Sequence, residues 1–395
     1  MPLPTSGDFT ATSSGTTSGT LIEPELARAG DDITGLAIWA VVFAGGIGSR
    51  FWPLSTPERP KPLLALVTGN SLLEDTVGRL QPLIPPERVL VVTSRDIAPA
   101  IRGAVQDLPE ENILIEPRPL GTAAALAWGA QEVARRAGPE TPVCAIHADL
   151  AVSFPGAFRD SIGRAAAVAN REGAIVALGV RPTRAEPSFG HIELGDALDS
   201  ENPLASGGAY QVANFVEKPT EADAAVLCGD GALWHSGIII GSAKVMLEKL
   251  GRYTPEIAPG LDALTAGNLP AFAGMIRSVS IERGLLERIK KFLVLLADFG
   301  WDDVGTWASL RRARDLDDDG NGALGSVQFV DATSNVVHTE SGTVVLFGVS
   351  RLLVVALPGL TFVTTLDRAN DLKPLLDALP GSLRINPTGG GRSSV

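Results

Sequence analysis

The chain has 395 residues, which is more than one average domain, so we expect two domains. Hydrophobic residues make up 45% of the chain and charged residues 20%, a balance typical of a globular protein with a sizeable core. No apolar run approaches the ~20 residues of a membrane span. The start of the chain also lacks a basic segment followed by an apolar one, so we expect a cytoplasmic protein with no membrane partner.

The formal net charge is −12 at pH 7, which argues against a nucleic-acid partner because duplex binding usually requires a basic face. This overall charge would also repel an anionic substrate, so local arginine and lysine side chains or a divalent cation would have to hold it. Cys144 and Cys228 are far apart and form no CxxC pair. Neither a disulfide framework nor a zinc site is therefore expected.

Residues 1–35 are rich in serine, threonine and glycine and then acidic, a composition that predicts a disordered leader. The first strand is expected at residues 38–43, where a short run is β-branched and uncharged. Such a run is typical of a strand buried on both faces of a parallel sheet.

A glycine-rich loop follows this strand directly and carries Gly45, Gly46 and Gly48. Glycine lets the backbone take positive φ angles and approach a ligand, so that amide N–H groups can point at phosphate oxygens. Arg50 adds a guanidinium group that fits phosphate, and Lys61 adds a second positive charge further along. The loop lacks the Gly-Lys-Ser/Thr sequence of a P-loop, and prolines after it prevent a long helix, so a dinucleotide fingerprint is not expected.

Helical and strand patterns then alternate along the chain. Apolar spacing predicts helices at residues 71–83, 97–108 and 121–137, and strands at residues 89–93, 112–116 and 143–146. Strands separated by helices imply right-handed βαβ crossovers and an α/β fold with a doubly wound, mixed but mostly parallel sheet. Ligands of such sheets bind beyond the carboxyl ends of the strands.

Shorter strands are expected after residue 174. The predicted strands are 175–180, 191–194, 211–216, 233–240 and 292–296, and the predicted helices are 243–250, 281–289 and 307–315. The acidic, glycine-containing stretch 317–322 resembles a calcium loop only superficially, because no glutamate closes it, and we interpret it as a linker. Short β-type runs and a terminal helix at 368–379 follow. We therefore expect an α/β domain at 36–316 and a small β-rich domain at 317–395.

The loop sequence GGIGSRFWPLSTPERPKP resembles the signature of the sugar-1-phosphate nucleotidyltransferases. Within that family it is most similar to the mannose-1-phosphate guanylyltransferases, or GDP-mannose pyrophosphorylases. The resemblance implies that Gly45, Gly46 and Gly48 hold the nucleoside triphosphate, that Arg50 meets its phosphates, and that Lys61 stabilises the transferring group. It runs from about residue 40 to residue 310 and continues more weakly to residue 379.

Two aspartates could simply cap helices: Asp149, at the end of a predicted strand, and Asp303, in the sequence FGWDDVGTW. The resemblance implies instead that both bind a catalytic metal, because they match the aspartates of the family's A-D and W-x-D-V-G-x-W motifs. Two carboxylates, completed by phosphate oxygens and waters, suit Mg²⁺. The chain departs from the guanylyltransferase pattern at His147 and Leu150, where proline and histidine are usual.

The sequence FVEKP could be a solvated turn. It resembles the family's F-x-E-K-P, which implies that Glu217 reads sugar hydroxyls and Lys218 grips the sugar phosphate. In WHSG, His235 replaces an asparagine that contacts the sugar in the family, and Glu282 with Arg283 replaces an aspartate and a tyrosine. These departures leave the sugar open, because a neutral imidazole donates one hydrogen bond whereas an amide donates two.

Glu116 and Thr122 lie in EPRPLGTAA, which resembles the family's base-binding segment E-P-x-x-x-x-T-A. Guanine offers N–H donors on the edge that a carboxylate can accept from. Glu116 is therefore expected to contact the base.

The resemblance implies transfer of a guanylyl group from GTP to mannose 1-phosphate, with Mg²⁺ as cofactor and with Arg50, Lys61 and Lys218 as catalytic residues. The C-terminal segment resembles a short β-helix-like cap used for packing or dimer contacts, so a homodimer is one expected assembly. Two alternatives remain open. One is transfer of a thymidylyl or uridylyl group to another hexose 1-phosphate, which His235 and Glu282 favour. The other is a regulator that binds nucleotide sugars without turnover, although a sensor would have less need of both metal-binding aspartates.

Overall fold

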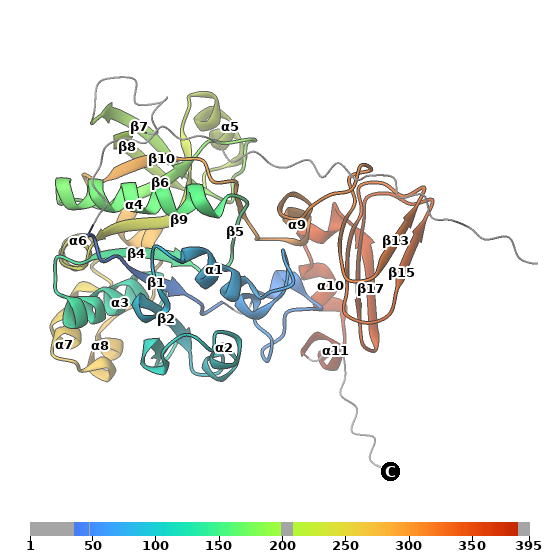
Figure 1. The fold of residues 1–395 in the computed structure, drawn as a ribbon, viewed down its shortest axis with the longest axis horizontal. Helices are drawn as coiled ribbons and strands as arrows, with labels where there is room; N and C mark the ends of the chain where they lie inside the picture. Colours follow the sequence, from blue (N-terminus) through green and yellow to red (C-terminus); the bar gives the residue numbers. More distant parts are fainter. Residues whose placement is uncertain (1–34, 47, 199–207, 386–395) are drawn as a thin grey trace, which may run out of the picture.

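The computed structural model describes residues 35–46, 48–198 and 208–385. The leader expected at residues 1–35 lies outside these residues, apart from its last position. Figure 1 shows a large α/β part, in blue through yellow to light orange, beside a smaller β-rich part in darker orange and red.

A nine-stranded mixed sheet forms the centre of the described α/β part, in the order β3-β2-β1-β4-β9-β6-β10-β8-β7. Its strands are β1 (Trp39–Phe43), β2 (Val89–Ser94), β3 (Ile113–Glu116), β4 (Pro142–His147), β6 (Val176–Val180), β7 (Gly190–Ala197), β8 (Ala209–Glu217), β9 (Leu233–Ser242) and β10 (Leu293–Ala297). The pairings from β3 to β4 are parallel, as is that of β6 with β10. Strands β7, β8 and β9 pair antiparallel. The sheet is therefore mixed, as expected, but less dominated by parallel pairs than the sequence suggested.

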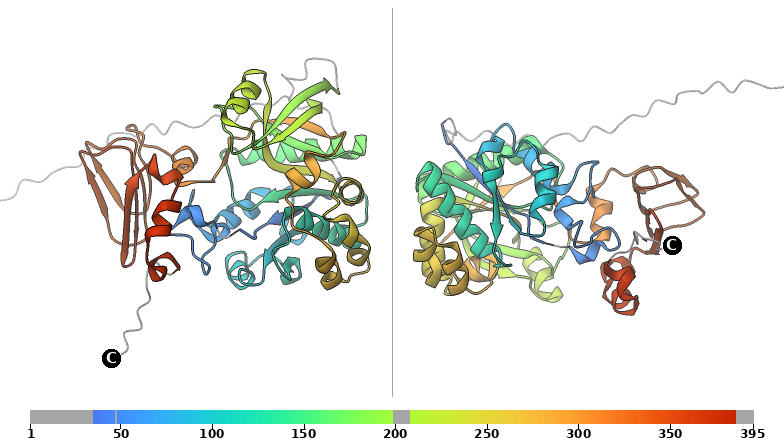
Figure 2. Two further views of the ribbon diagram at one scale, coloured as in Figure 1. Left: turned by 180° about the vertical axis from the view of Figure 1, so that it is seen from behind. Right: turned by 90° about the horizontal axis from the view of Figure 1, so that it is seen from below.

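Helices cover both faces of this sheet, and the two further views in Figure 2 show the layers. The helices of the α/β part are α1 (Leu72–Leu80), α2 (Ala98–Ala104), α3 (Thr122–Ala137), α4 (Pro155–Glu172), α5 (Glu221–Gly229), α6 (Ala243–Tyr253), α7 (Leu261–Thr265) and α8 (Leu269–Met275). Apolar residues of α1, α2 and α4 pack on one face, and those of α3, α6 and α8 pack on the other. The segment expected to be helical at residues 281–289 contains a single π-helical turn, Glu282–Leu286.

Local sequence explains where several of these elements begin. Helix α1 starts at a capping box, in which the Ser71 hydroxyl accepts from the backbone N–H of Glu74 and the Glu74 carboxylate accepts from that of Ser71. Helix α3 starts after Gly121, whose φ is 85°. A Cβ at that glycine would lie 2.6 Å from the carbonyl oxygen of Val279, so the close approach of these two segments requires glycine.

A small two-stranded sheet links the two halves of the α/β part. Strand β5 (Leu150–Val152) follows β4 directly, and it pairs antiparallel with β11 (Trp301–Asp303), which follows β10. Because Leu150 pairs with Asp303, this register brings the end of β4 beside β11. Sequence patterns did not predict this pairing, since each strand is only three residues long.

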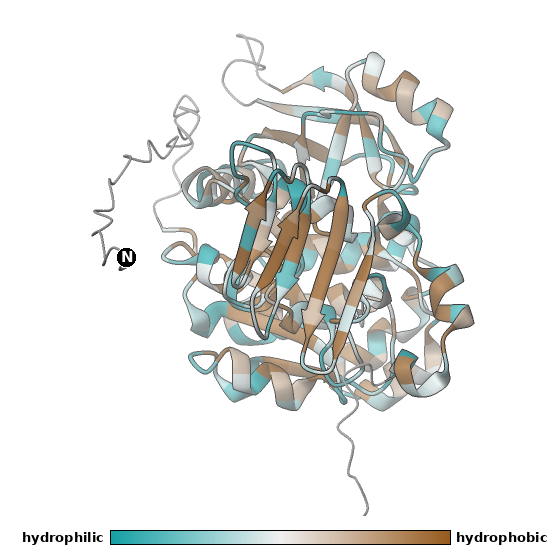
Figure 3. Cartoon of the chain, turned by 90° about the vertical axis from the view of Figure 1, so that its right-hand side faces the viewer, coloured by the Kyte–Doolittle hydropathy of each residue, from teal (hydrophilic) through white to brown (hydrophobic). Residues whose placement is uncertain are grey.

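The C-terminal part is β-rich, as expected. It contains β12 (Gly322–Leu324), β13 (Val327–Val330), β14 (Val336–Thr339), β15 (Val344–Phe347), β16 (Leu352–Leu357), β17 (Leu360–Thr365), α10 (Lys373–Ala378) and α11 (Gly381–Ile385), and α9 (Trp307–Ala313) precedes it. Strands β12, β14 and β16 pair parallel, as do β13 and β15, and β17 is antiparallel to β16. Figure 3, which looks at this part from the side, shows strands coloured mainly as hydrophobic.

The β-rich part packs on the segment that follows the glycine loop. One apolar cluster includes Phe51 and Leu64 of that segment, Trp307 of α9, and Leu353 of β16. Arg314 is buried here and donates to the carbonyl oxygens of residues 66 and 337. In the part of the chain that the structure describes, no helix is long and apolar enough to cross a membrane.

Candidate active site

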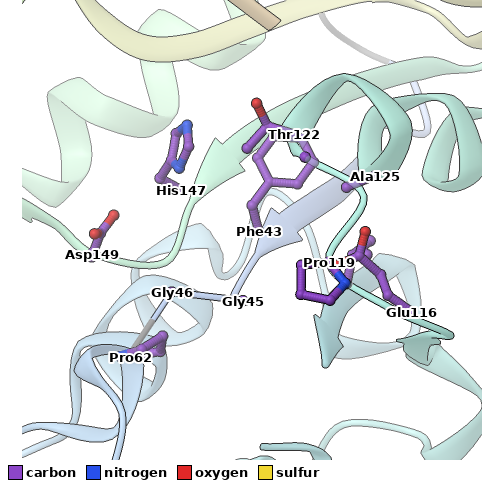
Figure 4. A pocket seen from close by; sticks show the side chains of 12 residues that line it. Phe43, Gly45, Gly46, Pro62, Glu116, Pro119, Thr122, Ala125, His147 and Asp149 are labelled. Atoms are coloured by element: carbon purple, nitrogen blue, oxygen red, sulfur yellow. The ribbon is translucent and has the colours of Figure 1, made fainter. Parts of the chain in front are cut away.

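The glycine loop follows β1 at the carboxyl end of the parallel strands. Gly45 and Gly46 line a first cavity of about 320 Å³, shown in Figure 4. Gly48 has a φ of 75° and lies so close to Lys61 that any side chain on it would collide with the Cβ of that lysine. Gly48 therefore allows the backbone at this position to lie against Lys61.

Lys61 reaches the end of β4. Its Nζ atom lies 2.6 Å from Oδ2 of Asp149, and its side chain is only 11% exposed. The same Nζ lies 5.6 Å from the centre of the Phe51 ring, a distance that allows a cation–π contact. Lys61 is thus held between a carboxylate and an aromatic ring.

Asp149 and Asp303 lie close together because β5 pairs with β11. Asp149 directly precedes Leu150, the residue that pairs with Asp303, and both aspartates line a second cavity of about 330 Å³. The expectation that Asp303 could cap a helix is wrong, because Thr306 provides the capping hydroxyl of α9. The structure thus brings both predicted metal ligands to one place.

The two aspartates have opposite pKa shifts. Burial alone would raise the pKa of Asp149, but the neighbouring ammonium group of Lys61 lowers it below its usual value. Burial raises the pKa of Asp303, and repulsion by Asp149 and Asp302 adds to this effect, although Lys61 opposes it. The negative charge of Asp303 is therefore only partly compensated by neighbouring positive charge.

Glu116, at the end of β3, points into the first cavity, where Phe43 and Pro119 provide apolar walls. Its Oε1 atom is buried and has no hydrogen-bond partner among the described residues. Burial raises the pKa of Glu116 to about 7, and a hydrogen bond from the Leu120 backbone offsets part of the rise. This carboxyl group is therefore available to a ligand with N–H donors.

Thr122, the first residue of α3, lines both cavities. Its hydroxyl accepts a hydrogen bond from the backbone N–H of Ile281 at 3.0 Å. That contact ties the first turn of α3 to the segment that carries Glu282.

The second cavity gathers the side chains that were expected to contact a sugar phosphate. It is lined by Glu217, Lys218, His235 and Glu282. The solvated-turn expectation is wrong for Glu217, whose side chain is 7% exposed, whereas Lys218 is 56% exposed and its Nζ lies 3.1 Å from Oε1 of Glu217. Lys218 has a φ of 52°, a left-handed backbone that is rare for a lysine before proline.

His235 and Glu282 face each other across this cavity. Nε2 of His235 lies 4.0 Å from Oε1 of Glu282, and Nδ1 of His235 is buried without a partner among the described residues. Burial lowers the pKa of His235 to about 4, although Glu282 opposes the shift. The imidazole is therefore neutral at pH 7 and can offer one donor and one acceptor.

Arg50 lies on a third cavity of about 480 Å³ rather than on the first. Its Nη1 atom is 3.8 Å from the position that a Cβ would occupy on Gly305, and Gly305 and Asp303 line the same cavity. Arg50 is exposed. The predicted phosphate-binding arginine thus lines a cavity that shares Asp303 with the second cavity.

Sequence reasoning did not include His147 among the candidate residues. This side chain, the last of β4, lines both the first and the second cavity and packs edge-on against Phe43 with ring centres 5.4 Å apart. Its position two residues before Asp149 on the same strand end was the available signal. Trp301 is a second such residue, because its indole N–H donates to the carbonyl oxygen of Ser236 and both residues line the second cavity.

The described residues contain no group of three or more His, Cys, Asp and Glu side chains placed to hold a metal ion. Two carboxylates, Asp149 and Asp303, are nevertheless adjacent, and the second has little compensating charge. Mg²⁺ usually takes one or two protein carboxylates and completes its octahedron with waters and substrate phosphates. The donor set therefore fits such an ion bound together with a phosphate substrate.

The chain belongs to the nucleotidyl transferase family, whose model matches residues 39–320. It is 30% identical to mannose-1-phosphate guanylyltransferase 2 of Escherichia coli O157:H7, over 87% of this chain and 73% of that protein. It is 27% identical to a mannose-1-phosphate guanylyltransferase of Sinorhizobium fredii, over 86% of this chain and 67% of that protein. A crystal structure from Thermus thermophilus, described as a mannose-1-phosphate geranyltransferase, has a TM-score of 0.78 and 34% identity, with 87% of this chain and 99% of that chain covered.

Proposed function

We propose that this protein transfers a guanylyl group from GTP to α-D-mannose 1-phosphate and forms GDP-mannose and pyrophosphate. The observation that carries the proposal is the position of Asp149, which lines both the first and the second cavity and holds Lys61 at 2.6 Å. Two substrates that enter these cavities would meet at Asp149. The proposal also draws on the mannose-1-phosphate guanylyltransferases to which the chain is similar.

In this proposal the nucleotide occupies the first cavity. The guanine edge would donate to Glu116, whose buried Oε1 has no partner among the described residues. The backbone of Gly45, Gly46 and Gly48 would follow the phosphates, with the start of α3 at Thr122 beside them. The apolar walls and the single carboxyl group suit a flat base with several N–H donors.

The sugar phosphate would occupy the second cavity. Glu217 and Glu282 would accept from its hydroxyls, His235 would donate or accept one hydrogen bond, and Lys218 would meet its phosphate. Lys218 is exposed and is paired only with Glu217 in the described structure, so it can turn toward an anion. Burial, and then repulsion from Glu282, raises the pKa of Glu217, because too few donors surround its carboxylate to offset these effects. Sugar hydroxyl groups would supply such donors.

Asp149 and Asp303 would hold Mg²⁺, which when bound would neutralise negative charge on the α-phosphate. Lys61 would stabilise the charge that develops on that phosphate, and Arg50 would hold the phosphates beyond it. The sugar phosphate oxygen attacks the α-phosphorus in line, so the reaction needs no covalent enzyme intermediate. The contribution of the protein is then positioning and charge stabilisation.

A second candidate keeps the chemistry and changes the substrates. The pair of His235 and Glu282 favours it, because an imidazole 4.0 Å from a carboxylate presents different hydrogen-bonding groups from the asparagine and aspartate of the similar family. The test is pyrophosphate release with Mg²⁺ across four nucleoside triphosphates and a panel of hexose 1-phosphates. Release only with GTP and mannose 1-phosphate supports the main proposal, and release with another pair supports the second candidate. No release would favour a binding protein without turnover.

We also propose that the β-rich part is a β-helix-like domain beginning near residue 317 and that it contributes to a homodimer. Parallel pairing within β12-β14-β16 and within β13-β15 supports the first point. For the second, Val330, Val345 and Phe347 on β13 and β15 are 48%, 61% and 69% exposed. Sedimentation of the protein and of a Phe347→Ser variant tests the assembly, because a dimer through this surface would dissociate more readily in the variant.

A further inference from the structure

The third cavity contains three arginines, although the chain as a whole carries a net charge of −12. Arg50, Arg184 and Arg312 line it, and the carboxylates of Glu186 and Asp303 also line it. A polyanion would be repelled by the overall charge of the protein, so a local group of guanidinium side chains is needed to hold one. This cavity, with a volume of about 480 Å³, provides such a group of guanidinium side chains.

Carboxylates hold two of these guanidinium groups in place. Arg312 donates from Nε to Oδ2 of Asp302 at 2.7 Å and from Nη2 to Oδ1 at 3.0 Å. Arg184 donates from Nε and Nη2 to Oε2 of Glu186 at 3.2 and 3.1 Å, and it stacks over the Trp234 ring. Each guanidinium has five N–H donors and uses two in its ion pair, so three remain for a ligand.

The position of the cavity beside Asp303 suggests which ligand it would hold. Asp303 lines both the second cavity and the third. In an in-line displacement at phosphorus, the attacking oxygen and the leaving oxygen lie on opposite sides of the reacting atom. A sugar phosphate that attacks from the second cavity would therefore expel the leaving group toward the third.

We infer that Arg184 and Arg312 join Arg50 in a pyrophosphate site, in which Asp302 and Glu186 act as positioning residues for the two guanidinium groups. The inference rests on the proposed nucleotidyl transfer and adds two arginines and their partners to it. Of the reacting groups, Arg312 would contact only the leaving pyrophosphate. It therefore contributes to binding of pyrophosphate and of the nucleoside triphosphate, but not to binding of the nucleotide sugar, which has no phosphate at that place.

The test uses the full chain and the variants Arg312→Gln and Arg312→Lys. Arg288→Gln is the matched control, because Arg288 forms a similar two-bond pair with Glu256, at 2.6 and 3.0 Å, and lines none of the three cavities. The side-chain exposures also match, at 37% and 18% for the control pair and 41% and 16% for Arg312 and Asp302. Arg184 is the poorer choice because its stacking on Trp234 also supports the fold.

Binding of inorganic pyrophosphate is measured by calorimetry at fixed Mg²⁺, and the KM values of pyrophosphate and GDP-mannose are measured in the reverse reaction. Arg312→Gln is expected to weaken pyrophosphate binding about 10- to 100-fold, the size of one lost charge-assisted hydrogen bond, and to leave the KM of GDP-mannose within about twofold. Arg312→Lys should recover part of the loss, because it keeps the charge without the planar fork. Arg288→Gln should change neither value.

Unchanged pyrophosphate binding in Arg312→Gln, or equal weakening of pyrophosphate and GDP-mannose, would overturn the inference. Calorimetry with pyrophosphate needs no turnover, so the outcome does not depend on the base or the sugar. Loss of pyrophosphate binding in Arg312→Gln would support the site even if the protein formed no GDP-mannose. Conversely, the protein could form GDP-mannose while Arg312→Gln binds pyrophosphate as well as the parent does. That result would support the proposed function and overturn the pyrophosphate site.

Discussion

The ammonium group of Lys61 is bonded to the carboxylate of Asp149, with 2.6 Å between Nζ and Oδ2, although 88 positions separate the two residues in the chain. This pair joins the segment after the glycine loop to the end of β4. It also means that a positive charge already sits on one of the two proposed metal ligands. Binding of a metal and a phosphate would move Lys61 from the carboxylate toward the new anion.

Asp149→Asn and Asp303→Asn are both expected to abolish turnover while the protein still folds, but their effects on stability should differ. Asp149→Asn leaves the nearly buried ammonium group of Lys61 without its ion pair, so we expect a loss of about 1–3 kcal/mol. Asp303→Asn removes a carboxylate whose pKa is raised by burial and by neighbouring aspartates, so stability should stay equal or rise. Urea denaturation and steady-state rates measure the two effects. Activity retained within a few-fold in either variant would contradict the metal assignment.

Lys61→Ala should reduce turnover about 100- to 1,000-fold, the usual effect of removing a group that stabilises charge in a transition state. The loss of folding stability should be smaller. The control is Lys244→Ala, which also removes a lysine from an ion pair, with Glu140 at 3.0 Å, but at an exposed site. A collapse of the melting temperature in Lys61→Ala, with the rate of the remaining folded protein unchanged, would show that the lysine has only a structural role.

Glu116 should make base binding dependent on pH near neutrality. Its pKa in the free protein is about 7, and guanine N–H groups bind the ionised form, so affinity should rise with pH up to about 7 and then level off. GDP-mannose is the better probe, because its phosphates do not titrate in this range. Glu116→Gln should remove the pH dependence and narrow the preference for guanine over adenine. A pH dependence that persists in this variant would assign the titration to another group.

The same pKa shift predicts an effect on folding. Because the folded pKa of Glu116 lies above the unfolded value, its ionisation favours the unfolded state, and stability is lost as the pH rises from about 4.5 to 7. Glu116→Gln should therefore be more stable than the parent protein at pH 8, by an amount on the order of a few kcal/mol. Denaturant titrations at pH 5 and pH 8 compare the two proteins.

His235 should have the opposite effect on stability. Burial lowers its folded pKa to about 4, below the ordinary value of 6.5, so the unfolded state binds the proton more readily. Stability is lost as the pH falls from about 6.5 toward 4, by roughly 2 kcal/mol at pH 5. His235→Asn should lose less stability between pH 7.5 and pH 5. The same variant should change the KM of the hexose 1-phosphate and leave that of GTP unchanged, and equal changes in both would argue against a sugar contact.

Several elements could be predicted from short stretches of sequence. The buried run before the glycine loop forms β1, and Ser71 with Glu74 caps α1, because these features depend on neighbouring residues alone. Helix α4 was not predicted, although it has 18 residues and covers one face of the sheet. Two small residues on its buried side, Ser161 and Gly163, weaken the apolar pattern that would have indicated it.

Local sequence was enough to recognise the family and the fold class and to nominate candidate residues, because the glycine loop and the motifs around Asp149, Glu217 and Asp303 are short strings of neighbouring residues. Which of these residues share a cavity follows from the folded chain. The three-residue pairing of β5 with β11 places Asp303 beside Asp149, and Arg50 lines the third cavity rather than the first. The unpartnered carboxyl oxygen of Glu116 likewise appears only after folding. Burial and long-range pairing set these properties, and neither is encoded in the spacing of neighbouring residues.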